Sequence, residues 1–282
     1  MSSARLFPLL VALFAISPAS TRPMAADPVQ VKHARIELLS EHASVKVGSD
    51  FLLGVHFLLE PGWHIYWVNP GDSGQAPVFK WQLPPGFTAG EVLWPQPHRL
   101  QSSPQVVDYG YRDEVLLMVP IHVARFDNIG SAGSPLITLD AKWLICREVC
   151  MPDHAQLRLA LPFASSAQDR NTDAAPLFAN AKKLLPKPLP STWRTTVESG
   201  KDTLTLAVRA GKPIAEAEFF PLDPGQIENA APQKTIRTAT GVKMTFRKSD
   251  LLVKPIDALR GVLVLPSGEA YRLNAPATKP RP

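Results

Sequence analysis

The sequence predicts an all-β protein with two domains, a β-sandwich followed by a second, smaller β-sandwich-like domain. Short apolar or alternating segments, the pattern of strands, recur along the chain. Clusters of Gly, Pro, Asn and Asp separate these segments at short intervals. The 29 prolines argue against long helices, because an interior proline breaks a helix. Many short strands with frequent turns are typical of a sandwich.

The first 26 residues have the layout of a secretory signal peptide. Arg5 supplies a positive start, an apolar run covers residues 6–16, and small residues follow up to Ala26. The apolar run is shorter than the roughly 20 residues that a transmembrane helix needs. We therefore expect cleavage after Ala26 and export to the periplasm, where a pair of cysteines can oxidise and stay oxidised.

The charge and the motif content exclude several function classes. The formal charge is +5, and loss of Arg5 and Arg22 with the signal peptide leaves +3, because residues 1–26 hold no Asp or Glu. Lysines and arginines are scattered and form no basic stripe interleaved with aromatic residues. We therefore expect no nucleic-acid partner. The sequence contains no G-x-S-x-G or H-E-x-x-H motif, so hydrolase chemistry finds no support.

The first predicted domain covers residues 27–165. Residues 51–60 and 114–124 are apolar at almost every position, as in strands that are covered on both faces. Residues 136–145 and 154–162 alternate between apolar and polar, and we expect them to pair as a hairpin across the segment between them. Turn clusters separate the strands: NPGDSG (69–74), LPPGF (83–87) and WPQPH (94–98).

A linker and a second domain follow. Residues 166–190 begin small and polar and include one predicted short helix at 175–186, which Pro186 ends. From residue 191 to residue 282 the strand pattern returns, with hairpin turns expected near residues 199–202 and 266–268. No residue pattern in this second domain suggests a catalyst.

The chain has two cysteines, Cys146 and Cys150, separated by three residues. At this spacing the two Cα atoms can come within disulfide range. A loop this short removes little freedom from the unfolded chain, so such a disulfide stabilises inefficiently. This argument favours a redox couple over a structural disulfide but leaves both open.

Metal binding is the third interpretation of the pair. Cys146, Cys150 and His154 would share one face of a helix, and Met151 would add a soft ligand that suits Cu(I). Pro152 would interrupt such a helix, and the flanking strand patterns indicate a loop instead.

Three ordered motifs resemble a known family. They are PGWHIYWVNPGDSG (61–74), VDYGYRDEVLLMVPI (107–121) and AKWLICREVCMPDHAQLRLALP (141–162). Together they resemble the amino-terminal periplasmic domain of the thiol:disulfide interchange protein DsbD. Within that family they look most like the ScsB-like branch, which is associated with suppression of copper sensitivity. The resemblance covers roughly residues 30–165, and the second β-domain also fits this branch.

The resemblance implies a fold and an activity. The family domain is an immunoglobulin-like β-sandwich, and its catalytic pair matches Cys146 and Cys150 here. It acts as a thiol:disulfide oxidoreductase without a cofactor. The partners implied are a membrane-embedded electron donor of the DsbD or CcdA type and periplasmic thioredoxin-like proteins. Either cysteine could attack, and we prefer Cys150.

The resemblance also implies residues that shield the pair. A cap loop matches residues 107–111 and includes Asp108, Tyr109 and Tyr111. From the residues alone, Asp108 could instead cap a turn and the two tyrosines could be core residues. Aromatic residues beside the pair match Trp63, His64 and Tyr66, although a histidine in such a strand is more often a core residue.

The sequence departs from the family pattern in two ways. The spacing between its cysteines is shorter than that in DsbD itself. The membrane segment and the thioredoxin-like domain of the family are not in this sequence, so we expect a separate protein to supply electrons. The alternative function is a non-catalytic periplasmic binding module, related to copper, with a structural disulfide.

Overall fold

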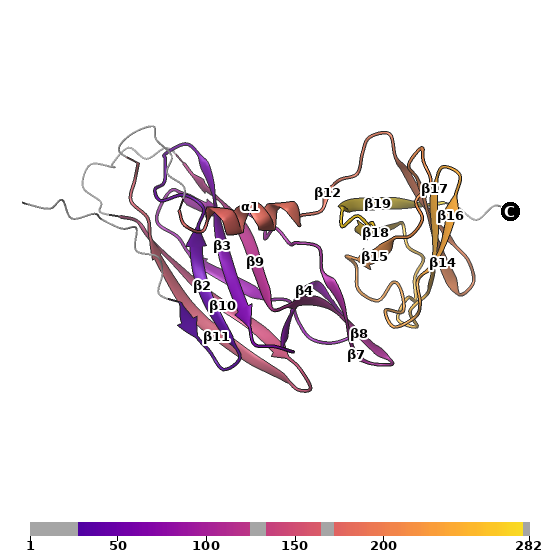
Figure 1. Cartoon of the computed structure of the whole chain (residues 1–282), viewed down its shortest axis with the longest axis horizontal. Helices are drawn as coiled ribbons and strands as arrows, with labels where there is room; N and C mark the ends of the chain where they lie inside the picture. Colours follow the sequence, from indigo (N-terminus) through magenta and orange to yellow (C-terminus); the bar gives the residue numbers. More distant parts are fainter. Residues whose placement is uncertain (1–27, 125–133, 165–171, 279–282) are drawn as a thin grey trace, which may run out of the picture.

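The computed structural model describes residues 28–124, 134–164 and 172–278. The predicted signal peptide lies outside these residues. The described chain is almost entirely β-structure with one α-helix, in agreement with the predicted fold class. We call strands β1–β11 the first domain and strands β12–β19 the second domain; they lie side by side along the long axis of the molecule (Figure 1).

The first domain is an immunoglobulin-like sandwich of two sheets. One sheet has the order β1-β2-β3-β9-β6: β1 (Val29–Gln30), β2 (Ala34–Ser40), β3 (Asp50–Leu59), β9 (Glu114–Val123) and β6 (Phe87–Ala89). The other has the order β11-β10-β4-β8-β7: β11 (Cys150–Ala160), β10 (Leu136–Cys146), β4 (His64–Gly71), β8 (Val106–Arg112) and β7 (His98–Ser103), with β5 (Val78–Gln82) also pairing with β10. Residues from both sheets form one hydrophobic core, which includes Ile36, Leu53, Ile137 and Leu157.

The strands that the sequence predicted are present. The hairpin of β10 and β11 is longer than expected, because β11 begins at Cys150 and not near His154. The two strands pair without interruption from Leu136–Ala160 to Cys146–Cys150. The cysteines are therefore the last residue pair of a hairpin.

The helix α1 (Ala175–Lys183) explains why β9 is apolar on both faces. Alternate residues of β9 face the sandwich core, and the intervening Leu116 and Met118 pack against Phe178 and Ala181 of the helix. Gly54 of β3 lies beneath this contact, where a Cβ atom would overlap Leu116. The segment predicted as a linker thus carries a helix that packs on the first domain (Figure 1).

The second domain is a strongly bent sheet around its own core. Its order is β15-β18-β19-β13-β14-β17-β16: β15 (Glu218–Pro221), β18 (Ala258–Val264), β19 (Ala270–Thr278), β13 (Arg194–Ser199), β14 (Thr203–Arg209), β17 (Gly241–Arg247) and β16 (Lys234–Thr238). The short β12 (Lys187–Pro188) pairs with β19. Both predicted hairpins occur, as β13–β14 and β18–β19.

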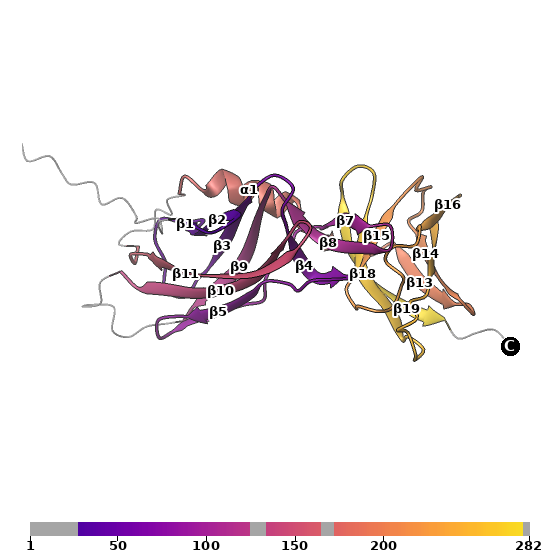
Figure 2. The same ribbon diagram turned by 90° about the horizontal axis from the view of Figure 1, so that it is seen from below.

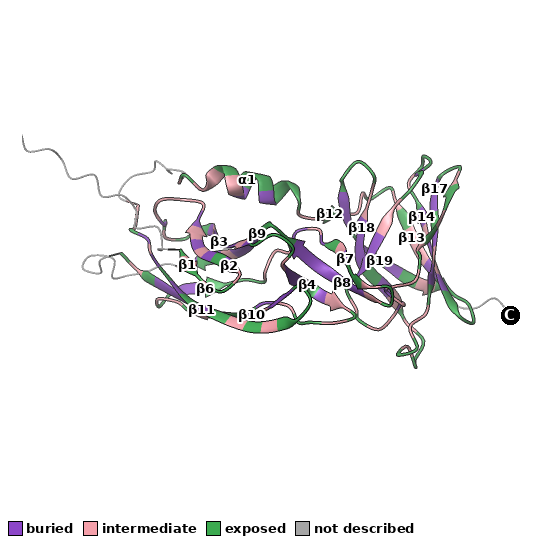
Figure 3. Ribbon diagram, turned by 60° about the horizontal axis from the view of Figure 1, so that its bottom comes forward, coloured by how far each residue is buried: buried purple, intermediate pink, exposed green. Residues whose placement is uncertain are grey.

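The two domains share a buried junction. Strands β4, β7 and β8 of the first domain extend to the second domain beside β15 and β18 (Figure 2). There Phe220 packs edge-on against Trp67 and Tyr109, with ring centroids 6.4 and 5.4 Å apart. The buried stretch of β4 and β8 lies in the middle of the molecule (Figure 3). Strand β4 begins beside the cysteine pair, and the junction joins its other end to the second domain.

Candidate functional site

The cysteine pair closes the β10–β11 hairpin. Cys146 and Cys150 are disulfide-bonded, with their Cα atoms 4.2 Å apart, and the turn between them is residues 147–149. Cys146 is 2% exposed, whereas Cys150 is an exposed residue. In the described part of the chain, β11 is the edge strand of its sheet, so no strand pairs with it on the side away from β10. An incoming protein therefore reaches Cys150 first.

Tyr66 connects the sulfurs to the interior. Strand β4 pairs with β10 at a single position, where His64 lies opposite Cys146. Tyr66 lies two residues further along and on the same face of the strand. Its buried hydroxyl donates to Cys146 Sγ at 2.9 Å and lies 3.2 Å from Cys150 Sγ.

Burial keeps the Tyr66 phenol protonated. Burial raises the pKa of Tyr66, and the Asp108 carboxylate raises it further, while the Ser73 hydroxyl lowers it. The phenol therefore remains a hydrogen-bond donor at neutral pH. A hydrogen bond to a charged acceptor is roughly twice as strong as one to a neutral acceptor. Tyr66 would thus stabilise a thiolate at either sulfur more than it stabilises the disulfide.

His64 is a buried, neutral neighbour of the pair. Its ring meets that of Tyr66 edge-on, with centroids 5.3 Å apart. Burial lowers the pKa of His64; the Asp108 carboxylate opposes this shift and Arg112 adds to it. Among the described residues, His64 Nε2 has no hydrogen-bond partner. His64 is therefore a neutral imidazole packed against Tyr66.

A glycine-rich segment, residues 69–74, covers Tyr66; it comprises the last three residues of β4 and the three that follow, and we call it the glycine-rich loop. Gly74 adopts φ 79°, and a Cβ atom there would overlap the Tyr66 ring, so only glycine allows the loop this close. Asp108, 1% exposed, accepts hydrogen bonds from the Ser73 amide and hydroxyl, both at 2.9 Å, and from the Ser102 hydroxyl. Asp108 therefore shapes the loop. The sequence predicted a turn here, and the NPGDSG glycines were the signal for a close approach.

The other predicted shielding residues have different surroundings. Residues 107–111, which the resemblance implies to be a cap loop, belong to strand β8. The Tyr109 hydroxyl donates to Asn229 Oδ1, and the Tyr111 hydroxyl donates to the Pro95 carbonyl. Burial raises the pKa of both tyrosines. Trp63 stacks on His33 with ring centroids 3.8 Å apart. A shielding role for these three aromatic residues stays a prediction.

The residues of the metal interpretation do not share a helical face. Cys150 and His154 lie on strand β11, where four residues span about 13 Å. Met151 packs against the first core, and its sulfur lies 3.9 Å from Lys32 Nζ. In the described part of the chain, no group of three or more His, Cys, Asp or Glu side chains is placed to hold a metal ion.

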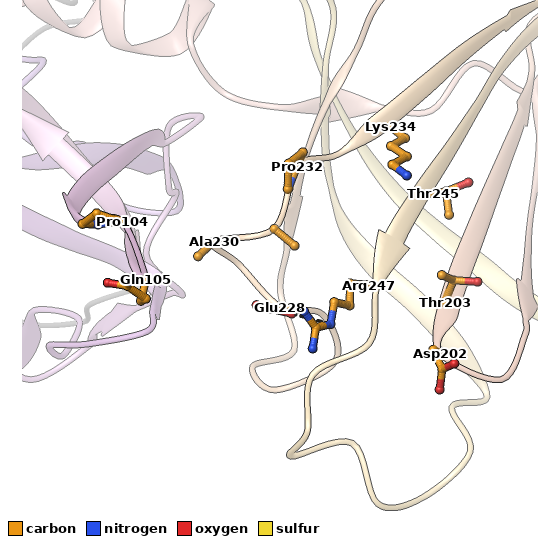
Figure 4. A pocket seen from close by; sticks show the side chains of 11 residues that line it. Pro104, Gln105, Asp202, Thr203, Glu228, Ala230, Pro232, Lys234, Thr245 and Arg247 are labelled. Atoms are coloured by element: carbon orange, nitrogen blue, oxygen red, sulfur yellow. Dashed lines mark ion pairs between the residues drawn. The ribbon is translucent and has the colours of Figure 1, made fainter.

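Among the described residues, two pockets are of note, one on the β10–β11 hairpin and one at the β7–β8 turn. A pocket of about 490 Å³ lies along the β10–β11 hairpin and is lined in part by Val78, Leu144, Pro152 and His154; neither cysteine lines it. A pocket of about 520 Å³ lies between Gln105, in the β7–β8 turn, and second-domain residues that include the ion-paired Glu228 and Arg247 (Figure 4). The first pocket lies on the hairpin that carries the cysteines, and its Leu144 and Pro152 are two residues from Cys146 and Cys150.

The fold and the site together define a class of protein. A β-sandwich with a disulfide at the end of an edge hairpin, and a phenol hydroxyl on both sulfurs, has the features of a thiol:disulfide interchange module. Residues 36–162 match the family model described as "Thiol:disulfide interchange protein DsbD, N-terminal". This part of the chain belongs to that family.

The similarity in fold extends into the second domain. The crystal structure of the N-terminal periplasmic domain of ScsB from Proteus mirabilis superposes with a TM-score of 0.68. The match covers 92% of this chain and 100% of that chain, at 17% sequence identity. Both chains thus share a fold. No curated protein matches the sequence. Within the described residues, no helix has the length and apolarity to cross a membrane.

Proposed function

We propose that the protein transfers electron pairs through Cys146 and Cys150 to disulfides of other periplasmic proteins. The observation that carries this proposal is the Tyr66 hydroxyl in contact with both sulfurs of a disulfide whose second cysteine is exposed. A purely structural disulfide needs neither a donor for a thiolate nor an exposed cysteine. Membership of the first domain in the DsbD family supports the same activity.

The exchange would proceed in two balanced steps. In the reduced protein, the Cys150 thiolate attacks one sulfur of the substrate disulfide and forms a mixed disulfide, and the substrate's other sulfur leaves as a thiolate that takes up a proton. The Cys146 thiolate then attacks Cys150 Sγ. This re-forms the Cys146–Cys150 disulfide and releases the second substrate thiol. One protein dithiol and one substrate disulfide become one protein disulfide and one substrate dithiol.

The site supports this division of roles. Cys150 is exposed and Cys146 is buried, so an attacking group and a resolving group are distinct. The Tyr66 hydroxyl lies within hydrogen-bond distance of both sulfurs and would stabilise whichever one carries the charge. The pocket on the hairpin, which Val78, Leu144 and Pro152 line together with Lys142, Asp153 and His154, would receive the substrate segment around its cysteine.

The partners and the compartment are part of the proposal. The family resemblance favours a membrane-embedded donor of the DsbD or CcdA type and thioredoxin-like acceptors. The compartment proposed is the periplasm, because the similar ScsB structure is described as a periplasmic domain and the sequence predicts a signal peptide. Exchange in the opposite direction uses the same two steps in reverse.

The test is the reduction potential of the Cys146–Cys150 pair, measured by equilibration with glutathione or dithiothreitol and thiol trapping. We expect a value between about −120 and −270 mV, the range of thiol:disulfide oxidoreductases. A value below about −300 mV would identify a structural disulfide and refute the proposal. The double Cys146→Ser and Cys150→Ser variant should fold and lose all exchange activity.

A further inference from the structure

We propose that Asn229, in the second domain, is a positioning residue for the disulfide site: its side chain anchors the glycine-rich loop that holds Tyr66 against the sulfurs. This inference rests on the proposed function, because it assigns the second domain a part in the chemistry of the cysteine pair. The argument follows a continuous series of contacts from the second domain to the sulfurs.

The first contact joins the second domain to the loop. Asn229 is 7% exposed, and its Nδ2 donates to Asp72 Oδ1 at 2.8 Å. Its Oδ1 accepts from the Tyr109 hydroxyl at 2.9 Å, and its carbonyl accepts from Arg99 at 2.7 Å. Asp72 Oδ2 in turn accepts from the Val107 amide at 2.8 Å. The Asn229 side chain is thus fixed on both sides, and so is the carboxylate that it holds.

The second domain also holds the start of the loop. Asn69 is 2% exposed, and its Nδ2 donates to the Pro221 carbonyl at 2.8 Å. The Oδ1 of the same side chain accepts from the Gly71 amide at 3.1 Å. Buried polar groups whose hydrogen-bond partners are removed cost free energy, so these contacts specify one loop position. The loop is therefore anchored from the second domain at two places.

The loop then transmits this position to Tyr66. Ser73 directly follows Asp72 and is held by Asp108, and Gly74 packs directly on the Tyr66 ring. Tyr66 is fully buried, and its hydroxyl reaches both sulfurs. Within this series, Gly74 is the residue that packs on the ring, while His64 contacts the ring from within β4. We expect loss of the hydrogen bond from Asn229 to Asp72 to loosen Tyr66, and so to weaken the hydrogen bond from the Tyr66 hydroxyl to the sulfurs.

This loss has a chemical consequence that a structural role lacks. The Tyr66 hydroxyl favours the reduced pair, because a thiolate accepts a hydrogen bond more strongly than a disulfide sulfur does. The equilibrium constant for reduction should therefore fall when Tyr66 is loosened. A residue that only joins the domains would affect their stability and leave this constant unchanged. The junction has other contacts of that kind, such as Phe220 with Trp67 and Tyr109.

The experiment measures the equilibrium constant for reduction by dithiothreitol at pH 7 in the full chain. In Asn229→Ala we expect it to fall about fivefold, and in Tyr66→Phe by a similar factor. In the double variant we expect no further fall, because both changes remove the same hydrogen bond. The matched control is Glu218→Gln, which removes the ion pair with Arg99 across the same junction; Arg99 keeps its hydrogen bond to the Asn229 carbonyl, and Asp72 keeps its bond to the Asn229 side chain. The control should leave the constant unchanged.

An exchange of the two side chains keeps the proposal testable if Asn229→Ala unfolds. Asn229→Asp places two carboxylates face to face and should lower the constant as Asn229→Ala does. Adding Asp72→Asn restores one amide facing one carboxylate. The Tyr109 hydroxyl and the Val107 amide still find an acceptor oxygen on residues 229 and 72. The double variant should therefore return the constant to the wild-type value. Near-ultraviolet circular dichroism confirms that each variant is folded.

The ionisable groups near the sulfurs are the same in the wild type, in Asn229→Ala and in the two exchange variants. They are Tyr66 and His64 on β4, Asp108 and Arg112 on β8, and Arg147 and Glu148 in the hairpin turn. Asn229→Ala also adds and removes no charge, so a changed constant in that variant reports the position of these groups and not their identity.

Three results would overturn the inference. One is a folded Asn229→Ala protein with lower thermal stability and an unchanged constant. Another is a constant that Asn229→Ala lowers by the same factor in Tyr66→Phe as in the wild type. This result would show that Asn229 acts by another route. The third is a folded double variant, Asn229→Asp with Asp72→Asn, whose equilibrium constant remains as low as that of Asn229→Asp alone. A wild-type pair too reducing to exchange with glutathione would refute the proposed function, whereas the ratio between variants would still test the role of Asn229.

Discussion

The hydroxyl oxygen of Tyr66 lies 2.9 Å from Cys146 Sγ, although 80 residues separate the two in sequence. The same oxygen lies 3.2 Å from Cys150 Sγ. One buried phenol hydroxyl thus lies within hydrogen-bond distance of both sulfurs. Strand β4 makes this contact possible, because it pairs with β10 where His64 lies opposite Cys146 and continues to the domain junction. The site is therefore connected both to the hairpin and to the second domain.

The two single-cysteine variants should react differently with glutathione disulfide. Cys146→Ser leaves the exposed Cys150 thiol, which should form a mixed disulfide rapidly. Cys150→Ser leaves the buried Cys146 thiol, which should react at least about tenfold more slowly, because access and thiolate character control the rate. Mass spectrometry of samples quenched with acid measures both rates. Equal rates would contradict the assignment of Cys150 as the attacking cysteine.

Gly74→Ala should cost more stability than the same change at an open turn. Both Gly74 and Gly48 have positive φ, 79° and 74°, so alanine pays about 1–2 kcal/mol of backbone strain at each. Only at Gly74 would the new methyl group overlap the Tyr66 ring; nothing lies within 4 Å of a Cβ atom at Gly48. We expect Gly74→Ala to cost about 1–3 kcal/mol more, the usual range for overpacking.

Urea denaturation of both glycine variants measures this difference. Gly48→Ala is the matched control for backbone strain. A free energy of unfolding that falls equally in the two variants would show that the loop does not pack tightly on Tyr66.

The buried His64 should make the protein less stable in acid. Burial lowers its pKa in the folded state below the ordinary value of 6.5. Below pH 6.5 the unfolded chain then binds a proton that the folded chain excludes, so the free energy of unfolding falls as the pH falls towards the folded-state pKa. Above pH 6.5 both states are neutral and this contribution is constant.

The measurement is urea denaturation of the wild type and His64→Gln between pH 5 and 7.5. The difference in free energy of unfolding between the two proteins should be flat above pH 6.5 and should change below it in favour of His64→Gln. A difference that stays constant over the whole range would mean that His64 titrates alike in both states.

Helix α1 should stabilise the first domain without touching the redox site. Phe178 is fully buried against Leu116 and Met118, so Phe178→Ala should cost about 3–5 kcal/mol. The exposed Leu184 follows the helix, and Leu184→Ala should change stability by less than about 0.5 kcal/mol. Thermal denaturation checks both values. The reduction potential should be unchanged in both variants while they remain folded, and a shift in Phe178→Ala would reveal a link that the structure does not predict.

Local pattern was enough for much of the fold. The apolar stretches at 51–60 and 114–124 became β3 and β9, and the alternating segments around the cysteines became β10 and β11, because side-chain alternation in a strand is a local property. The helix near residue 175 was predicted from another local signal, a helical pattern of residues that Pro186 ends. Its docking on β9 was not, because the apolar face of a helix does not name the surface that covers it.

The site divides in the same way. The sequence by itself determined the cysteine pair, its position between two strands and its family, since these depend on short stretches of chain. Only the tertiary structure decided that Tyr66 contacts both sulfurs, that Gly74 covers its ring and that Asn229 holds the loop. These residues come from three separate segments, and their contacts exist only once β4 is placed between the hairpin and the second domain. Burial, hydrogen bonding and the absence of a Cβ atom at Gly74 are properties of that arrangement, and no single segment encodes them.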